Sequence, residues 1–84
     1  MAQLIHHHTR RVQDSYGTVY NVLIYGESRR DGTWEGWIEF SSEGSSDKVL
    51  RTGRETSQPH KAALEYWATG LEPTYLEGAF GRAQ

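Results

Sequence analysis

The segment from Arg51 to Ser57 carries side chains that could bind an anion. It leads into a run with helical spacing, and the unpaired amide protons at the start of a helix attract negative charge. Beside those amides, four side chains could also donate hydrogen bonds to the anion: Arg51, Arg54, Thr56 and Ser57. The alternative is structural, because one hydroxyl residue is enough to cap a helix and the arginines can pair with nearby carboxylates. The sequence contains no Gly-x-x-x-x-Gly-Lys-Ser/Thr phosphate loop.

Trp37 could anchor a contact with another protein. It lies between Glu35 and Glu39 on the charged side of its segment. Aromatic side chains are enriched at interfaces, because a large ring supplies contact area at little cost in entropy. Tyr25, on the second face of the preceding strand segment, completes this candidate surface. The alternative is that the first strand or the C-terminal segment covers Trp37, and the natural covers are then Tyr75, Leu76 and Phe80.

Two further clusters point to other ligands. His6 and His8 would lie on the same side of a strand, where alternate histidines can share a metal ion. Two ligands do not make a site, so we expect no metal and no cofactor. The pairs Arg10–Arg11 and Arg29–Arg30, near Tyr16, could meet a single-stranded nucleic acid. Acidic residues beside both pairs and a net charge of −2 argue against that partner.

The composition excludes several classes of protein. The 84 residues include no cysteine, so the chain has no disulfide, no thiol nucleophile and no thiolate zinc site. The longest apolar run is far shorter than the roughly 20 residues of a membrane helix. No secretory signal is recognisable, so we expect a cytoplasmic protein without a membrane partner. The carboxylates form no pattern that implies a raised pKa, and we expect no enzyme.

The short chain limits the core. We expect one domain over 1–84, with residues 1–4 and 82–84 disordered. A domain of this size buries only about 60–65% of the surface that its unfolded chain exposes. Three tryptophans, five tyrosines and two phenylalanines compensate in part. A homodimer or a protein partner would be an ordinary way to complete so thin a core.

Alternation of apolar and polar residues predicts strands over the following ranges: 5–12, 18–26, 33–41 and 48–52. The step Asp31-Gly32 is a strong hairpin signal between the second and third strands. A polar loop is predicted over 41–47. One sheet face and the main helix supply the predicted core: Tyr20, Val22, Ile24, Trp34, Ile38, Phe40, Leu64 and Trp67.

The main helix is predicted over about 57–69, because apolar residues recur there at three- and four-residue steps. Thr56 or Ser57 would cap it, Pro59 would lie in its first turn, and Gly70 would end it in a left-handed conformation. Pro73 starts a short C-terminal helix, with a strand as the alternative. The expected fold is α+β, a three- to four-stranded antiparallel meander with the main helix packed on one face.

Part of this pattern resembles a known family. The strand Tyr20-Asn-Val-Leu-Ile24, the Asp31-Gly32 turn and the helix with Ala62, Ala63 and Leu64 are similar to the HicB-like antitoxin fold. The Pro-Gly-Cys-like segment and the DNA-binding extension of that family are missing. The resemblance implies an antitoxin-like neutraliser of a small toxin. The stretches DGTWEGWIEF and LRTGRETSQPHKAALEYWATGLEPTYLEGAF resemble short bacterial proteins of no assigned activity, which imply no function.

These observations lead to one expected function and one alternative. We expect a small non-enzymatic module that binds another protein through an exposed aromatic sheet face around Trp37. Glu35 and Glu39 would set the choice of partner through charge. The alternative is a nucleic-acid or anion binder that uses Arg51, Arg54 and the start of the main helix.

Overall fold

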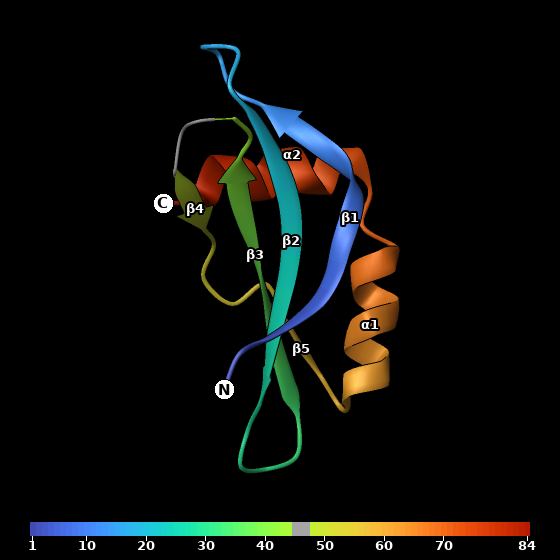
Figure 1. The fold of residues 1–84 in the computed structure, drawn as a ribbon. Helices are drawn as coiled ribbons and strands as arrows, with labels where there is room; N and C mark the ends of the chain where they lie inside the picture. The colour runs from blue at the N-terminus through green and yellow to red at the C-terminus, as the bar shows by residue number, and fades with distance from the viewer. Residues whose placement is uncertain (45–47) are drawn as a thin grey trace.

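The computed structural model describes residues 1–44 and 48–84. The elements in these ranges are β1 (Gln3–Gln13), β2 (Val19–Ser28), β3 (Trp34–Ser42), β4 (Val49–Arg51), β5 (Thr56–Gln58), α1 (Lys61–Thr69) and α2 (Pro73–Arg82). The strands form one antiparallel sheet in which β1, β2 and β3 lie side by side (Figure 1). This confirms the α+β class, the antiparallel sheet and the presence of two helices, the second beginning at Pro73, whereas the fifth strand, β5, was not predicted.

The far edge of β3 is shared by two short strands. Residues 49–51 of β4 pair with 39–41 of β3, and residues 56–58 of β5 pair with 34–36. Thr52 fills the gap between them, because its amide donates to the Ile38 carbonyl at 2.9 Å and its hydroxyl accepts from the Ile38 amide at 3.1 Å. The buried Thr52 therefore continues the ladder where the backbone alone cannot.

Both helices cover the same face of the sheet. Figure 1 shows α2 crossing behind β2 and β3, with α1 beside β1. The core between these layers contains Tyr20, Val22, Ile24, Ile38, Phe40, Ala68, Leu76 and Ala79. Trp67 packs against this core only in part, and Trp34 is half-buried beneath the Lys61 ammonium. The opposite side, which we call the helix-free face, carries Leu23, Tyr25, Trp37 and Glu39.

Leu64 of α1 fits into a hole made by two glycines. Gly26 and Gly36 are directly paired across β2 and β3. A Cβ atom at Gly26 would lie 2.4 Å from Leu64 Cδ2, and one at Gly36 would lie 2.7 Å from Leu64 Cδ1. Both distances are shorter than any van der Waals contact. The two glycines therefore allow α1 to approach the sheet closely enough to bury Leu64 completely.

The main helix starts later than the predicted residue 57. Residues 56–58 extend the sheet as β5, and Pro59 follows them outside the helix. His60 is the N-cap, and its Nδ1 accepts a hydrogen bond from the Ala63 amide at 3.2 Å. The prediction that Thr56 or Ser57 caps the helix is wrong. Both residues lie in β5, where pairing with β3 engages their backbone. Gly70 has φ −93°, so the predicted left-handed ending is also wrong.

The two ends of the chain are held by the sheet. Gln3 and Leu4 belong to β1, and Arg82 belongs to α2. Gln84 and Arg51 exchange two backbone hydrogen bonds, each 3.0 Å long. The expectation of disorder over 1–4 and 82–84 is therefore not met at these residues. The loop predicted over 41–47 lies outside the described residues at 45–47, and its first two residues belong to β3.

Candidate functional site

Trp37 lies on the helix-free face, but its ring is not exposed. Only 5% of the residue is accessible to solvent. The Tyr25 ring is stacked at a centroid distance of 6.4 Å, and the guanidinium carbon of Arg51 lies 4.3 Å from the centroid of the Trp37 ring. The expectation of an exposed aromatic anchor at Trp37 is therefore wrong.

Trp37 is covered by a side chain from β4, the short strand that pairs with β3. The expected covers all belong to α2 on the opposite face: Tyr75, Leu76 and Phe80. Arg51 at the end of β4 covers Trp37 instead, and its backbone is fixed by the bonds to Gln84. A guanidinium over an indole is attracted by the negative face of the ring, so Arg51 gains by lying flat there. Arg51 thus belongs to a structural stack.

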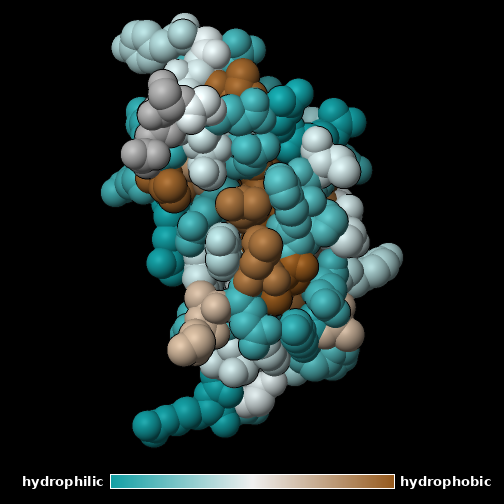
Figure 2. All heavy atoms as spheres, viewed as in Figure 1, coloured by the Kyte–Doolittle hydropathy of each residue, from teal (hydrophilic) through white to brown (hydrophobic). Residues whose placement is uncertain are grey.

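The two carboxylates that flank Trp37 are also engaged. Glu39 accepts a hydrogen bond from the indole nitrogen of Trp37 at 3.2 Å, and Glu35 lies 3.6 Å from the guanidinium of Arg29. Leu4 and Val49 are the large apolar residues most exposed around this face, at 54% and 52%. Figure 2 shows the apolar residues of this side as a broken line between hydrophilic ones. Scattered apolar side chains of this kind are ordinary for a protein surface.

The structure does not assemble the anion site. Thr56 and Ser57 lie in β5, and α1 begins after His60. The Thr56 hydroxyl accepts from the side-chain Nε2 of Gln58 at 2.7 Å. Arg51 lies over Trp37, and Arg54 is an exposed residue between β4 and β5. The helix start and the arginines that carried the anion hypothesis are thus separated, and this premise is wrong.

The histidines of β1 serve different purposes. The His6 and His8 rings meet edge to face at 5.7 Å. Among the described residues, no three His, Asp or Glu side chains are grouped so that they could hold a metal ion. His8 is instead a buried structural residue. Its Nδ1 accepts from the Arg10 amide at 3.2 Å, so the proton on Nε2 is directed at the Leu71 carbonyl, also at 3.2 Å.

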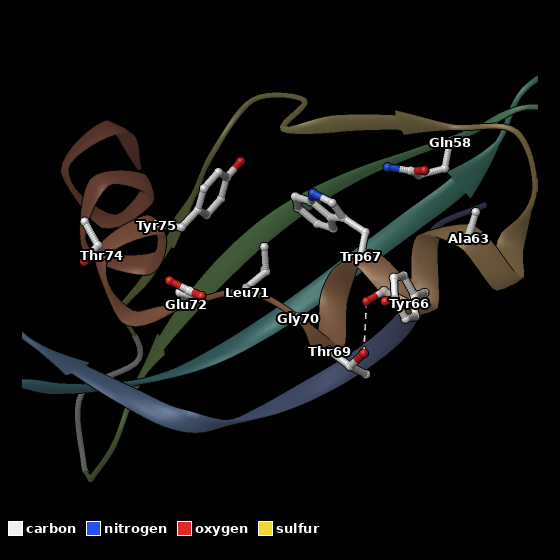
Figure 3. Close-up of a pocket in the computed structure, with 10 residues that line it drawn as sticks. All are labelled: Gln58, Ala63, Tyr66, Trp67, Thr69, Gly70, Leu71, Glu72, Thr74 and Tyr75. Atoms are coloured by element: carbon white, nitrogen blue, oxygen red, sulfur yellow. Dashed lines mark hydrogen bonds between the residues drawn. The ribbon is translucent and has the colours of Figure 1, made fainter.

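A groove between the two helices was not anticipated. It has a volume of about 760 Å³. Its walls come from α1, from the connection between the helices, from the start of α2 and from the end of β5 (Figure 3). We call it the α1–α2 groove, and it is lined by Gln58, Ala63, Tyr66, Trp67, Thr69, Gly70, Leu71, Glu72, Thr74 and Tyr75.

Trp67 and Tyr75 form the aromatic corner of this groove. Their ring centroids are 6.0 Å apart and their planes are at 89°. Each ring comes from a different helix, and the outermost ring, Tyr66, is 84% exposed. Figure 3 shows the Trp67 indole between the Tyr75 phenol and the Gln58 amide, with Leu71 below it. Aromatic surface is thus accessible here, in contrast to Trp37.

Tyr75 is held in place by a polar cluster. Its hydroxyl donates to Glu55 at 2.6 Å, and Arg82 pairs with the same carboxylate at 2.6 Å. Burial, together with the Glu55 carboxylate, raises the pKa of Tyr75 to about 12. Burial would also raise the pKa of Glu55, but the hydrogen bonds from Arg82 and Tyr75 outweigh it and lower that pKa. The phenol therefore stays protonated and fixed at neutral pH.

His8 fixes the connection that lies along the groove. Its bond to the Leu71 carbonyl ties β1 to the segment between α1 and α2. Burial lowers the pKa of His8, in spite of the Leu71 bond that acts in the opposite direction. The ring is therefore neutral near pH 7, as its acceptor role toward Arg10 requires. The sheet thus supports the segment between α1 and α2, which forms one wall of the groove.

The sequence contained one signal for this groove. Residues 66 and 67 are neighbouring large rings on a helix, and neighbours on a helix point about 100° apart. Both rings cannot face one core. The prediction placed Trp67 in the core and considered Tyr75 only as an alternative cover of Trp37, so it missed the contact between the Trp67 and Tyr75 rings.

No family model matches this chain, and neither the curated proteins nor the solved structures include a match. Neither helix in the described residues has the length and apolar character that crossing a membrane requires.

Proposed function

We propose that the protein is a small, non-enzymatic, cytoplasmic module that binds a segment of another protein in the α1–α2 groove. The observation that carries this proposal is the accessible, perpendicular pair of Trp67 and Tyr75 inside a concave surface. A small toxin, which the resemblance to HicB-like antitoxins implies, is one partner of this class.

Aromatic residues in a concave surface are the usual source of binding energy between proteins. Tryptophan and tyrosine are enriched among residues whose truncation costs at least about 2 kcal/mol of affinity. Rigid rings lose little conformational entropy on binding. Tyr75 is already immobilised by Glu55, and Trp67 is partly packed against the core. Both rings are therefore prepared for a partner before it arrives.

The groove is preferred to the helix-free face for a physical reason. A docking surface must gain contact area when the partner arrives, and Trp37 has almost none left to bury. Its ring already contacts Tyr25 and Arg51. The groove offers Tyr66 at its rim and Trp67 and Tyr75 at its corner. We therefore keep protein binding as the proposed function and assign it to the α1–α2 groove instead of the helix-free face.

The ionisable groups of the Tyr75–Glu55 cluster beside the groove support a binding role rather than catalysis. A general acid or base works best with a pKa near the working pH. The pKa of Tyr75 is about 12, and the pKa of Glu55 is lowered. Neither group exchanges its proton readily at neutral pH. The cluster is suited to holding a ring in position.

Photo-crosslinking in the native cell tests the proposal. A photoreactive phenylalanine analogue replaces Tyr66 at the groove rim, and a matched protein carries it at Tyr16, which is 93% exposed in the turn between β1 and β2. Both positions are exposed tyrosines, so non-specific encounters affect them equally. We expect a defined adduct with another protein from position 66 and not from position 16.

Two outcomes would overturn the proposal. The first is equal crosslinking from both positions, which would show only random collision. The second is an adduct at position 66 with a second copy of this chain, which would make the groove a dimer interface.

A further inference from the structure

We infer that the α1–α2 groove receives a basic side chain, lysine or arginine, of the partner protein, seated in the corner between Trp67 and Tyr75. This inference rests on the proposed function, because it names the chemistry of the segment that binds. It follows from the charge of the groove and from the arrangement of its rings.

The charge of the groove comes from Glu72. It is the one acidic or basic residue, of the types Asp, Glu, Lys, Arg and His, among the lining residues. Glu72 is the N-cap residue of α2, but its side chain makes no capping hydrogen bond. It forms no ion pair with any residue in 1–44 or 48–84. Its carboxylate is therefore free to attract a cation.

The rings provide the second part of a cation site. The negative faces of aromatic rings attract a cation within about 6 Å of the ring centroid. Two rings at 89° with centroids 6.0 Å apart form adjacent walls, so one cation can contact both. Figure 3 shows Glu72 on the same side of the groove as Tyr75, with Leu71 between Glu72 and Trp67.

Tyr75 already attracts one cation within the protein. The Arg82 guanidinium lies 5.8 Å from its ring centroid, and Glu55 neutralises that guanidinium at 2.6 Å. The Arg82 charge therefore does not repel an incoming cation strongly. An anionic side chain would instead meet Glu72 with no basic group among the lining residues to offset it.

The test compares two peptides that differ in one charge. An acetylated, amidated Gly-Lys-Gly peptide is titrated against the same peptide with norleucine, which has no ammonium group. The readout is the indole N–H signal of Trp67 in heteronuclear NMR spectra. The indole signals of Trp34 and Trp37 are internal controls, because neither ring lines the groove. We expect the lysine peptide to shift the Trp67 signal with higher affinity than the norleucine peptide.

Two matched variants assign the effect to Glu72. Glu72→Gln removes the groove charge, and Glu77→Gln removes the same charge from an exposed position of α2 outside the groove. We expect Glu72→Gln to weaken lysine binding roughly three- to tenfold and Glu77→Gln to leave it unchanged. Both residues are exposed, so both variants should fold.

Three outcomes would overturn the inference: equal binding of the two peptides, no shift of Trp67 with either, or equal effects of the two variants. Its failure is distinguishable from that of the proposed function. A protein adduct at position 66 without lysine selectivity would leave the binding function standing. Lysine selectivity without such an adduct would leave a cation site that no protein uses.

Discussion

The imidazole Nε2 of His8 lies 3.2 Å from the carbonyl oxygen of Leu71, and this bond connects the edge strand of the sheet to the segment between the helices. The two residues are 63 positions apart in the sequence. His8 also accepts from the Arg10 amide, where the register of β1 against β2 shifts. One buried ring therefore supports an irregular strand and one wall of the α1–α2 groove.

The burial of His8, with Nδ1 as the acceptor for the Arg10 amide, predicts a loss of stability on acidification. The pKa of His8 is lowered in the folded protein, so the unfolded state binds the proton more readily. The contribution is complete above the unfolded value of about 6.5 and is lost as the pH falls below it. Denaturant unfolding between about pH 7.5 and pH 5 should show this decrease in wild type.

Two variants isolate His8 in that experiment. His8→Gln retains a donor for Leu71 but cannot titrate, so its stability should vary less over the same pH range. His7→Gln removes an exposed histidine and should behave like wild type. A wild-type stability that is constant from pH 7.5 to pH 5 would contradict the assigned role of His8.

The fit of Leu64 between Gly26 and Gly36 predicts a large effect from one methyl group. Gly36→Ala would place a Cβ atom 2.7 Å from Leu64 Cδ1. Overpacking of this kind costs about 1–3 kcal/mol of unfolding free energy. Gly53→Ala is the control, because a Cβ atom there meets nothing within 4 Å. Equal unfolding free energies for the two variants would show that α1 does not approach the sheet as described.

Removal of Arg51 should expose Trp37. Arg51→Ala deletes the guanidinium that lies 4.3 Å from the indole centroid. We expect a loss of about 0.5–1 kcal/mol in unfolding free energy and faster quenching of tryptophan emission by acrylamide. Arg54→Ala removes the same charge from a nearby exposed position and should change neither quantity. Unchanged quenching in Arg51→Ala would mean that another group covers Trp37.

Glu55 should control the ionisation of Tyr75. Burial and the Glu55 carboxylate raise the pKa of Tyr75 to about 12. Glu55→Gln removes the negative charge and weakens the hydrogen bond, so the pKa of Tyr75 should fall toward the usual value of about 10. NMR of carbon-13-labelled tyrosine rings, followed through alkaline pH, measures it. Ionisation of Tyr75 at the same pH in both proteins would rule out the Glu55 contact.

The regular part of the fold could be predicted because it depends on local alternation. Tyr20, Val22 and Ile24 form an uninterrupted apolar face of one strand, whereas Asn21 interrupts the other face, and this pattern placed them correctly in the core. The same alternation placed Trp37 on the opposite face. It could not show its exposure, because the cover comes from Arg51, which is brought there by the pairing of β4 with β3.

The start of the main helix could not be predicted for a related reason. Thr56 and Ser57 are good capping residues, and local preference alone assigns them to a helix. Pairing with β3 competes with that preference and wins, because it satisfies backbone groups on an otherwise open part of that strand. The groove depends on the meeting of Trp67 and Tyr75 from two helices, which no single segment reveals.

The central claim is that a partner protein binds in the α1–α2 groove, and the affinity of the crosslinked partner for two matched variants tests it most directly. Thr74→Arg places a bulky side chain in the groove, and Thr9→Arg makes the same change at an exposed position of β1 outside it. We predict that Thr74→Arg weakens binding at least roughly tenfold and that Thr9→Arg leaves it unchanged. Equal affinities for the two variants would contradict the claim.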